Sequence, residues 1–311
     1  MSRVTELCGI VPPLVTPLSG PDRLDHAALE RILEHVMGAG VHGLFLLGTT
    51  GEAAALSYRV RREYVKRIVD YVDGRIPLLV NVTHTSLVET QSLADQAGED
   101  GADAIVVTTP YYLTLEPGEL LRYVTYVSQC AALPVFIYNM PGLTKTAFAL
   151  ETVREIMEQL PNVVGMKDSS GDFDYLRQVL ELKDRCRPQW RVFVGPERYL
   201  VDTVMHGGSG CVGGGANIWP SLFVELYQAA ISNDTVTLAS LREKLAELGA
   251  IYQYGAFGVG VIRGIKCAME LLGLCENHLA FPFQPVNELQ RSSIRDVLAR
   301  LELLPSRSRA E

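Results

Sequence analysis

The 311-residue sequence has no excess of positive charge, no closely spaced cysteine pair and no long uninterrupted apolar run. Acidic residues outnumber basic residues by 36 to 28, which gives a net charge of −8. This balance argues against nucleic acid or an anionic membrane as a partner. The most apolar window, residues 211–231, is interrupted by three glycines, Pro220 and Glu225, so we expect no membrane span. The six cysteines contain no C-x-x-C pair, and we interpret them as free thiols of a soluble, cytoplasmic protein.

Several signatures of other enzyme classes are also missing. There is no H-E-x-x-H, and the six histidines form no cluster in the sequence, so we expect no metal ion. The absence of a G-x-S-x-G elbow argues against an α/β-hydrolase. No G-x-G-x-x-G opens the first predicted helix, which argues against a dinucleotide-binding fold.

The sequence does contain eight short apolar runs, each bounded by Gly, Pro, Asp or Asn. Continuous apolar runs of this length are typical of parallel strands buried on both faces. They span residues 9–15, 43–47, 76–82, 103–107, 134–138, 163–166, 191–194 and 209–212. Amphipathic segments of helical length follow them, at residues 26–39, 57–72, 86–98, 117–130, 147–159, 173–184, 197–206 and 220–231.

Eight strand–helix alternations predict an α/β fold, specifically a (β/α)8 TIM barrel, with a doubly wound open sheet as the alternative. We expect residues 1–232 to form the barrel and catalytic domain. Residues 233–311 contain no further strand and show helical patterns at 236–252, 259–273 and 287–302. We therefore expect a C-terminal helical appendix packed on the barrel.

Candidate functional residues stand at the predicted strand ends, because barrel active sites lie at the carboxyl ends of the strands. Lys167 ends the sixth strand, where burial disfavours a lysine's charged form and a neutral amine can attack a carbonyl. Tyr138 ends the fifth strand and could move protons, whereas Thr49 and Thr50 form a glycine-flanked turn suited to a carboxylate. The alternatives are a Lys167–Asp168 ion pair, a core tyrosine and an ordinary capped turn.

Four motifs occur in order at these ends: GTTGE at 48–52, TPYY at 109–112, YN-x-P at 138–141 and G-x-KD-x-x-G at 165–171. Together they resemble the dihydrodipicolinate synthase / N-acetylneuraminate lyase family of class I, pyruvate-handling aldolases. The resemblance runs from about residue 9 through the helical appendix. It implies a (β/α)8 barrel with C-terminal helices, assembled as a homotetramer from two tight dimers.

The resemblance also implies roles for the catalytic residues. Lys167 would form a Schiff base with pyruvate or a 2-keto acid, and this covalent imine needs no cofactor or metal. Tyr138 would shuttle protons, and Thr49 would belong to the same relay. Tyr112 resembles the tyrosine that one subunit lends to its partner's relay. Thr50 matches the clamp on the substrate carboxylate.

Substrate-binding positions show both matches and departures. Val212 matches the apolar residue beside the bound pyruvyl group. Leu143 stands where the synthases carry an arginine, and a leucine cannot pair with a carboxylate. The sialic-acid lyases resemble this chain at Leu143, but they follow the glycine equivalent to Gly195 with an acidic pair. Here only Glu197 is acidic, and Gly214 replaces the lyase serine.

These features predict a lysine-imine lyase that uses or releases pyruvate, acting on a 2-keto-3-deoxy sugar acid or a related hydroxylated keto acid. Glu197 and Ser169 would bind its hydroxyls, and Arg198 a distal acid group. The alternatives are a 4-hydroxy-tetrahydrodipicolinate synthase, which joins pyruvate to aspartate semialdehyde, and a sugar-acid dehydratase. A non-catalytic keto-acid sensor and a purely structural oligomer are further alternatives.

Overall fold

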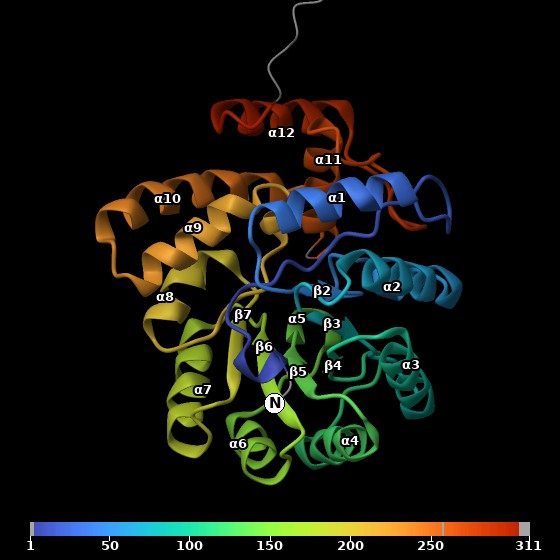
Figure 1. Cartoon of the computed structure of the whole chain (residues 1–311), viewed down its shortest axis with the longest axis vertical. Helices are drawn as coiled ribbons and strands as arrows, with labels where there is room; N and C mark the ends of the chain where they lie inside the picture. Colours follow the sequence, from blue (N-terminus) through green and yellow to red (C-terminus); the bar gives the residue numbers. More distant parts are fainter. Residues whose placement is uncertain (1–2, 257, 305–311) are drawn as a thin grey trace, which may run out of the picture.

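A sheet of eight parallel strands forms the centre of the computed structural model, which describes residues 3–256 and 258–304 (Figure 1). The strands are β1 (Gly9–Ile10), β2 (Leu44–Leu46), β3 (Leu78–Asn81), β4 (Ala104–Thr108), β5 (Val135–Asn139), β6 (Val163–Asp168), β7 (Arg191–Val194) and β8 (Gly210–Cys211). Their order is β1-β8-β7-β6-β5-β4-β3-β2. All eight predicted strands are therefore present, in the order of a barrel.

The barrel closes between the segment after β1 and strand β2. The Phe45 amide donates to the Pro12 carbonyl at 2.9 Å, and the Leu14 amide donates to the Phe45 carbonyl at 3.0 Å. Pro12 and Pro13 have no amide hydrogen, which is why the predicted run 9–15 forms only a two-residue strand. The predicted (β/α)8 barrel is confirmed, and the doubly wound alternative is wrong.

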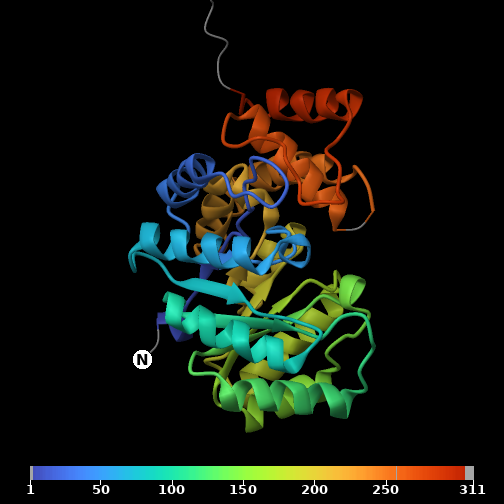
Figure 2. The same ribbon diagram turned by 90° about the vertical axis from the view of Figure 1, so that its right-hand side faces the viewer.

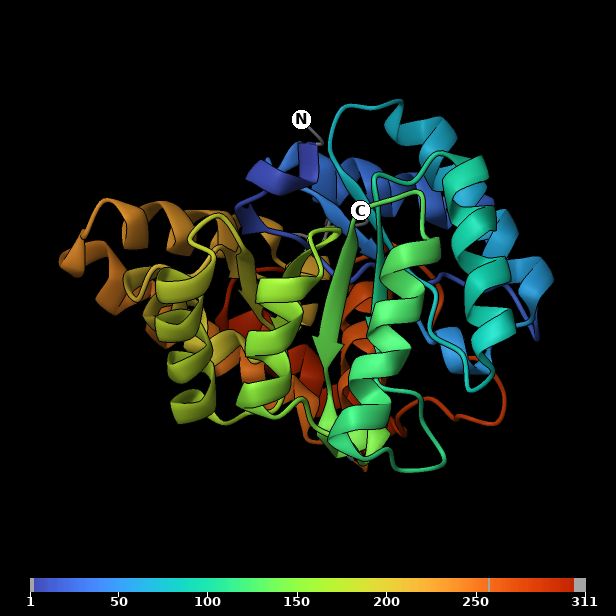
Figure 3. The same ribbon diagram turned by 90° about the horizontal axis from the view of Figure 1, so that it is seen from below.

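Helices cover the outside of the barrel (Figure 3). They are α1 (His26–Gly38), α2 (Tyr58–Val72), α3 (Leu87–Asp100), α4 (Pro117–Cys130), α6 (Leu150–Gln159), α7 (Phe173–Cys186), α8 (Leu200–Met205) and α9 (Pro220–Ile231). A further short helix, α5 (Pro141–Thr144), follows the carboxyl end of β5. The side chains of Ser57 and Asp172 accept N-cap hydrogen bonds at the starts of α2 and α7. Gly101 ends α3 with φ 99°, a conformation that glycine adopts readily.

Two apolar clusters explain why the strands are apolar throughout. One lies between the strands and the outer helices, and the other fills the barrel interior. Interior side chains include Phe45, Phe136, Tyr138, Phe193 and Val212. Because both faces of each strand are buried, the alternation of a half-exposed sheet is absent.

The C-terminal helices lie against one end of the barrel, next to α1 (Figure 2). They are α10 (Thr235–Leu248), α11 (Val259–Leu271) and α12 (Glu288–Arg300), with a 3₁₀ turn η5 (Gly249–Tyr252) between the first two. Residues 305–311 of the predicted appendix lie outside the described residues. Within the described ranges, no helix is long and apolar enough to cross a bilayer.

Two local expectations about helices need correction. The predicted helix 197–206 is divided into a 3₁₀ turn η3 (Glu197–Tyr199) and α8. The predicted helix 147–159 begins later, because the short helix α5 and an extended segment follow β5. The first difference follows soon after β7, where Glu197 lines the cavity described next.

Candidate active site

Lys167 lies on β6 with only 7% of its surface exposed. In the sheet it stands opposite Tyr138 of β5 and Phe193 of β7. Its amine nitrogen is 4.2 Å from the centre of the Tyr138 ring and 4.7 Å from that of Phe45. The amine therefore lies beside two aromatic rings in the barrel interior.

The ion pair between Lys167 and Asp168, the alternative to a Schiff-base role, is not formed. Asp168 instead accepts hydrogen bonds from the Asn139 side-chain amide at 2.7 Å and the Ser170 hydroxyl at 2.8 Å. Burial raises the pKa of Asp168 above its ordinary value. Among the described residues, no carboxylate lies within ion-pair distance of the Lys167 amine. The amine is thus left available to a bound molecule.

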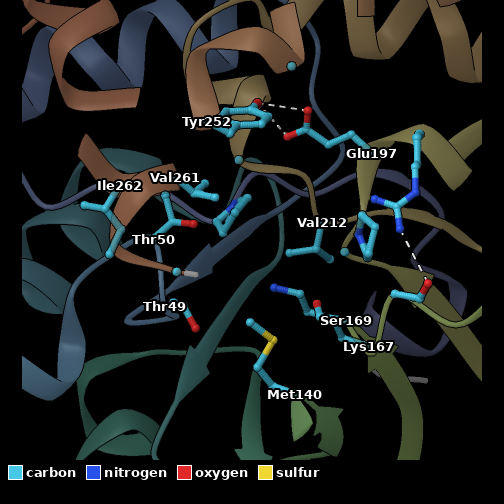
Figure 4. A pocket seen from close by; sticks show the side chains of 18 of the residues that line it. Thr49, Thr50, Met140, Lys167, Ser169, Glu197, Val212, Tyr252, Val261 and Ile262 are labelled. Atoms are coloured by element: carbon cyan, nitrogen blue, oxygen red, sulfur yellow. Dashed lines mark hydrogen bonds between the residues drawn. The ribbon is translucent and has the colours of Figure 1, made fainter. Parts of the chain in front are cut away.

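A cavity of about 960 Å³ opens beside this amine. Nine of the eleven predicted site residues line it: Thr49, Thr50, Tyr138, Lys167, Ser169, Gly195, Glu197, Arg198 and Val212. Figure 4 shows Lys167, Thr49 and Met140 directed into one part of the cavity, with Glu197 and Tyr252 at another. The strand ends therefore converge as the sequence predicts.

Glu52 anchors the turn that holds Thr49 and Thr50. The carboxylate of Glu52 is fully buried, forms an ion pair with Lys266 of α11, and accepts from the Ala280 amide at 2.8 Å. Lys266 also donates to the His278 carbonyl at 2.6 Å. Contacts from the C-terminal appendix therefore hold the threonine turn, a link that the sequence did not indicate.

Glu197 and Tyr252 form a hydrogen-bonded pair at the cavity wall. The Tyr252 hydroxyl lies 3.0 Å and 2.9 Å from the two oxygens of Glu197, and the Gly215 amide donates to Oε1 at 2.6 Å. Burial raises the pKa of Glu197 to about 7, while these two hydrogen bonds act in the opposite direction. Sequence reasoning identified Glu197 but missed Tyr252.

Ser169 and Gly195 are matched in space. A Cβ atom on Gly195 would lie 2.0 Å from the Ser169 hydroxyl oxygen, so a glycine at this position leaves room for the serine. Arg198 is exposed at the rim, with its guanidinium 4.4 Å from the Tyr199 ring. Among the described residues it has no carboxylate partner.

The two remaining predicted residues do not line this cavity. Leu143 lies on α5 and lines a smaller neighbouring cavity of about 310 Å³, which shares Thr49 and Tyr138 with the first. Tyr112 is 91% exposed, with φ 88°, in the loop after β4. A tyrosine with φ of this sign adopts a sparsely populated backbone conformation.

The space beside Gly214 is filled. A Cβ there would lie 2.7 Å from Cδ1 of the buried Ile265. A serine at this position, as in the sialic-acid lyases that the motifs resemble, would displace Ile265. Among the described residues, no group of three or more His, Cys, Asp or Glu side chains could hold a metal ion.

Comparisons with known proteins agree with this architecture. Residues 6–301 match the model of the dihydrodipicolinate synthetase family. A protein of Escherichia coli named "Probable 2-dehydro-3-deoxy-D-pentonate aldolase YjhH" is 34% identical over 96% of this chain and 98% of its own. Two solved structures are similar with a TM-score of 0.90 each. One is dihydrodipicolinate synthase from Bacteroides thetaiotaomicron, 41% identical over 94% of this chain and 98% of that one. The other is YagE of E. coli, solved with pyruvate, 30% identical over 95% and 99%.

The barrel, the enclosed lysine at a strand end and the cavity beside it define a class I aldolase, a lyase that works through a lysine imine. The chain belongs to the dihydrodipicolinate synthetase family. Members of this family act on pyruvate and other 2-keto acids.

Proposed function

We propose that this enzyme cleaves a 2-keto-3-deoxy sugar acid into pyruvate and a hydroxyaldehyde, and forms the same bond in reverse. One observation carries this proposal: the carboxylate of Glu197 lines the same cavity as the amine of Lys167 and can accept hydrogen bonds from sugar hydroxyls. The similarity to a pentonate aldolase supports it. Leu143 stands where the synthases carry an arginine, and this difference disfavours the synthase alternative.

In the proposed reaction, the neutral amine of Lys167 attacks the C2 ketone. The hydroxyl of Tyr138 donates its proton as the carbinol oxygen leaves as water, which gives an iminium and a Tyr138 phenolate that can accept the next proton. The C4 hydroxyl then loses its proton to Tyr138, the C3–C4 bond breaks, and its electron pair moves to the iminium nitrogen. The C4 fragment leaves as an aldehyde and the rest remains as an enamine. Tyr138 returns the proton to C3, and water releases pyruvate from Lys167.

The remaining proposed roles concern orientation. Thr50, which is 8% exposed, would bind the substrate carboxylate through its hydroxyl and the amides of the turn. Val212 would pack against the pyruvyl carbons. Thr49 would connect Tyr138 to the smaller cavity, which both residues line. Tyr112 of a second copy would enter that cavity and complete the relay.

The first experiment is borohydride trapping with pyruvate, followed by intact mass measurement and peptide mapping. We expect a covalent adduct on Lys167 that is absent from Lys167→Ala. Lys183→Ala is the matched control, because Lys183 is a buried lysine bound to Asp184 on the outer helix α7. If no adduct formed with wild type, the imine assignment would be wrong and the keto-acid sensor would be favoured.

The second experiment compares substrates. Cleavage of 2-keto-3-deoxy-D-pentonate or 2-keto-3-deoxy-D-gluconate to pyruvate is the expected activity. Faster condensation of pyruvate with aspartate semialdehyde would instead identify a 4-hydroxy-tetrahydrodipicolinate synthase. Loss of water without formation of pyruvate would identify a sugar-acid dehydratase.

We also propose a homotetramer built from two tight dimers, in which residues 1–232 form the catalytic barrel and residues 233–311 the appendix. The exposure of Tyr112 supports a partner subunit. Cytoplasmic location is supported by the six cysteines, all of which are free thiols.

A further inference from the structure

The contact between Glu197 and Tyr252 joins two distant parts of the chain at the cavity wall. Glu197 begins the 3₁₀ turn η3 directly after β7, whereas Tyr252 ends the turn η5 in the C-terminal appendix. The two residues are 55 positions apart, and both line the cavity that contains Lys167. The appendix therefore contributes a polar group to the barrel's cavity.

Two of the three consecutive glycines after β8, Gly213 and Gly215, make room for this pair. A Cβ on Gly213 would lie 2.8 Å from Cγ of Glu197, and a Cβ on Gly215 would lie 2.6 Å from the Tyr252 hydroxyl. The Gly215 Cβ would also lie 2.9 Å from the ring of Phe223. A larger residue in place of Gly213 or Gly215 would displace the pair, so the contact depends on glycine at both positions.

The hydrogen bonds that Glu197 already makes determine what else its carboxylate can bind. Its carboxylate has about four acceptor positions. The Gly215 amide and the Tyr252 hydroxyl occupy two of them. The remaining positions are on a group that lines the cavity, and they require donors. A substrate hydroxyl fits this requirement, whereas a substrate carboxylate would be repelled.

We propose that Tyr252 is a positioning and specificity-determining residue, which orients Glu197 to accept hydrogen bonds from substrate hydroxyls beyond C4. This inference rests on the proposed function, because it assigns the part of the cavity that would recognise the sugar chain. Tyr252 would not touch the reacting atoms. It would act through Glu197, and its effect would therefore depend on whether the substrate carries those hydroxyls.

The charge state of Glu197 offers an independent measure of this role. Burial raises the pKa of Glu197 to about 7, and the Tyr252 hydrogen bond lowers it. The other titratable and charged groups around Glu197 are Cys211 of β8 and Lys167 of β6. Arg198 and Arg242 also line the cavity. Removing the Tyr252 hydroxyl therefore raises the pKa of Glu197 further, and Glu197 becomes a worse acceptor at neutral pH.

The test is Tyr252→Phe, assayed by condensation of pyruvate with two aldehydes of equal length. D-glyceraldehyde carries two hydroxyls and propanal carries none. We expect the KM for glyceraldehyde to rise about 5- to 10-fold, the effect of one lost hydrogen bond, and the KM for propanal to change about twofold at most. The pH below which the glyceraldehyde KM increases should also move upward. Tyr254→Phe, which alters a tyrosine outside the cavity lining, is the matched control.

Glu197→Gln supplies the second variant, because it should remove both the pH dependence and the sensitivity to Tyr252→Phe in the double variant. Pyruvate trapping on Lys167 verifies that each variant folds. Equal KM changes for both aldehydes, or none for either, would overturn the inference while leaving the aldolase assignment intact. A wild type that traps pyruvate but condenses neither aldehyde would overturn the proposed function and this inference together.

Discussion

Tyr138 combines two properties in one side chain. Its ring packs against Lys167 and Phe45 in the barrel interior, and its hydroxyl is the proposed proton carrier. The two roles can be separated experimentally, because a phenylalanine at this position preserves the ring and removes only the hydroxyl. The structural and chemical roles then show up in different measurements.

We expect Tyr138→Phe to lower kcat by about 10²- to 10⁴-fold, the usual contribution of a positioned proton carrier. Thermal unfolding should change little, because the apolar contacts remain. Steady-state cleavage assays and calorimetry measure the two effects. The control is Tyr123→Phe on the outer helix α4, which should leave kcat unchanged. A Tyr138→Phe enzyme with normal kcat would remove Tyr138 from the mechanism.

Glu197 carries a prediction about stability as well as specificity. Burial raises the pKa of Glu197 from an ordinary 4.5 to about 7. The folded chain therefore holds this proton more tightly than the unfolded chain. The contribution of Glu197 to stability falls as the pH rises from 4.5 to 7, and the loss is complete above 7.

Glu197→Gln removes this titration, since an amide can still accept from Gly215 and donate to Tyr252. The melting temperature of the variant relative to wild type should therefore rise by a few degrees between about pH 5 and about pH 8. Calorimetry at both pH values checks this, with Glu243→Gln on the exposed face of α10 as the control. A difference that stays constant with pH would contradict the raised pKa.

At the scale of single elements, β6 shows how a strand positions its functional residue. The register between β5 and β6 shifts between Val135 and Phe136, where Val164 forms an extra residue. After the shift, Gly165 stands opposite Phe136 and Lys167 opposite Tyr138. A Cβ on Gly165 would lie 2.4 Å from the Phe136 ring and 2.5 Å from the Arg191 carbonyl oxygen.

We therefore expect Gly165→Ala to destabilise the fold by about 1–3 kcal/mol, because the new methyl group overpacks a rigid interior. Displacement of β6 should also reduce the rate of pyruvate trapping on Lys167. Urea unfolding and trapping kinetics measure these effects. Gly38→Ala on α1 is the matched control, because nothing lies within 4 Å of its added methyl group. Equal stability of the two variants would mean that β6 adjusts without strain.

The strands were predictable because their burial on both faces leaves a continuous apolar signal. Positions at strand ends, including Thr49 and Lys167, were predictable for the same reason. The register shift in β6 was not, because Val163 and Val164 are equally compatible with either register. Tyr252 was not predictable either, since its role depends on a contact 55 residues away. The three glycines were the available signal, although a sequence alone does not say which atoms fill the space beside them.

At the scale of the whole molecule, the appendix is part of the site rather than a separate attachment. Glu52 and Lys266 link the threonine turn of the barrel to α11, and Tyr252 reaches the cavity from η5. Glu52 and Lys266 are fully enclosed. Removing one charge from such a pair leaves the other buried and uncompensated.

Lys266→Met should therefore lower the free energy of unfolding by about 3–5 kcal/mol. It should also raise the KM for pyruvate, since the turn that carries Thr50 loses its anchor. The double variant Glu52→Gln/Lys266→Met should recover part of the lost stability, which urea unfolding of all four proteins can measure. Strictly additive losses would show that the two side chains do not interact.

The largest scale is the assembly, where Tyr112 and Lys167 should belong to the same site but to different subunits. Lys167→Ala and Tyr112→Phe should each be inactive or nearly so when purified alone. When the two are co-expressed in equal amounts, half of the dimers are hybrids, and each hybrid contains one site with an intact Lys167 and an intact Tyr112. Random pairing in a two-fold dimer therefore restores about one quarter of the wild-type activity.

Co-expression of Lys167→Ala with Tyr138→Phe is the control, because both residues lie in the same chain's cavity and no hybrid site is complete. Recovery in the first mixture and none in the control would establish the shared site, whereas no recovery in either would mean that each chain works alone.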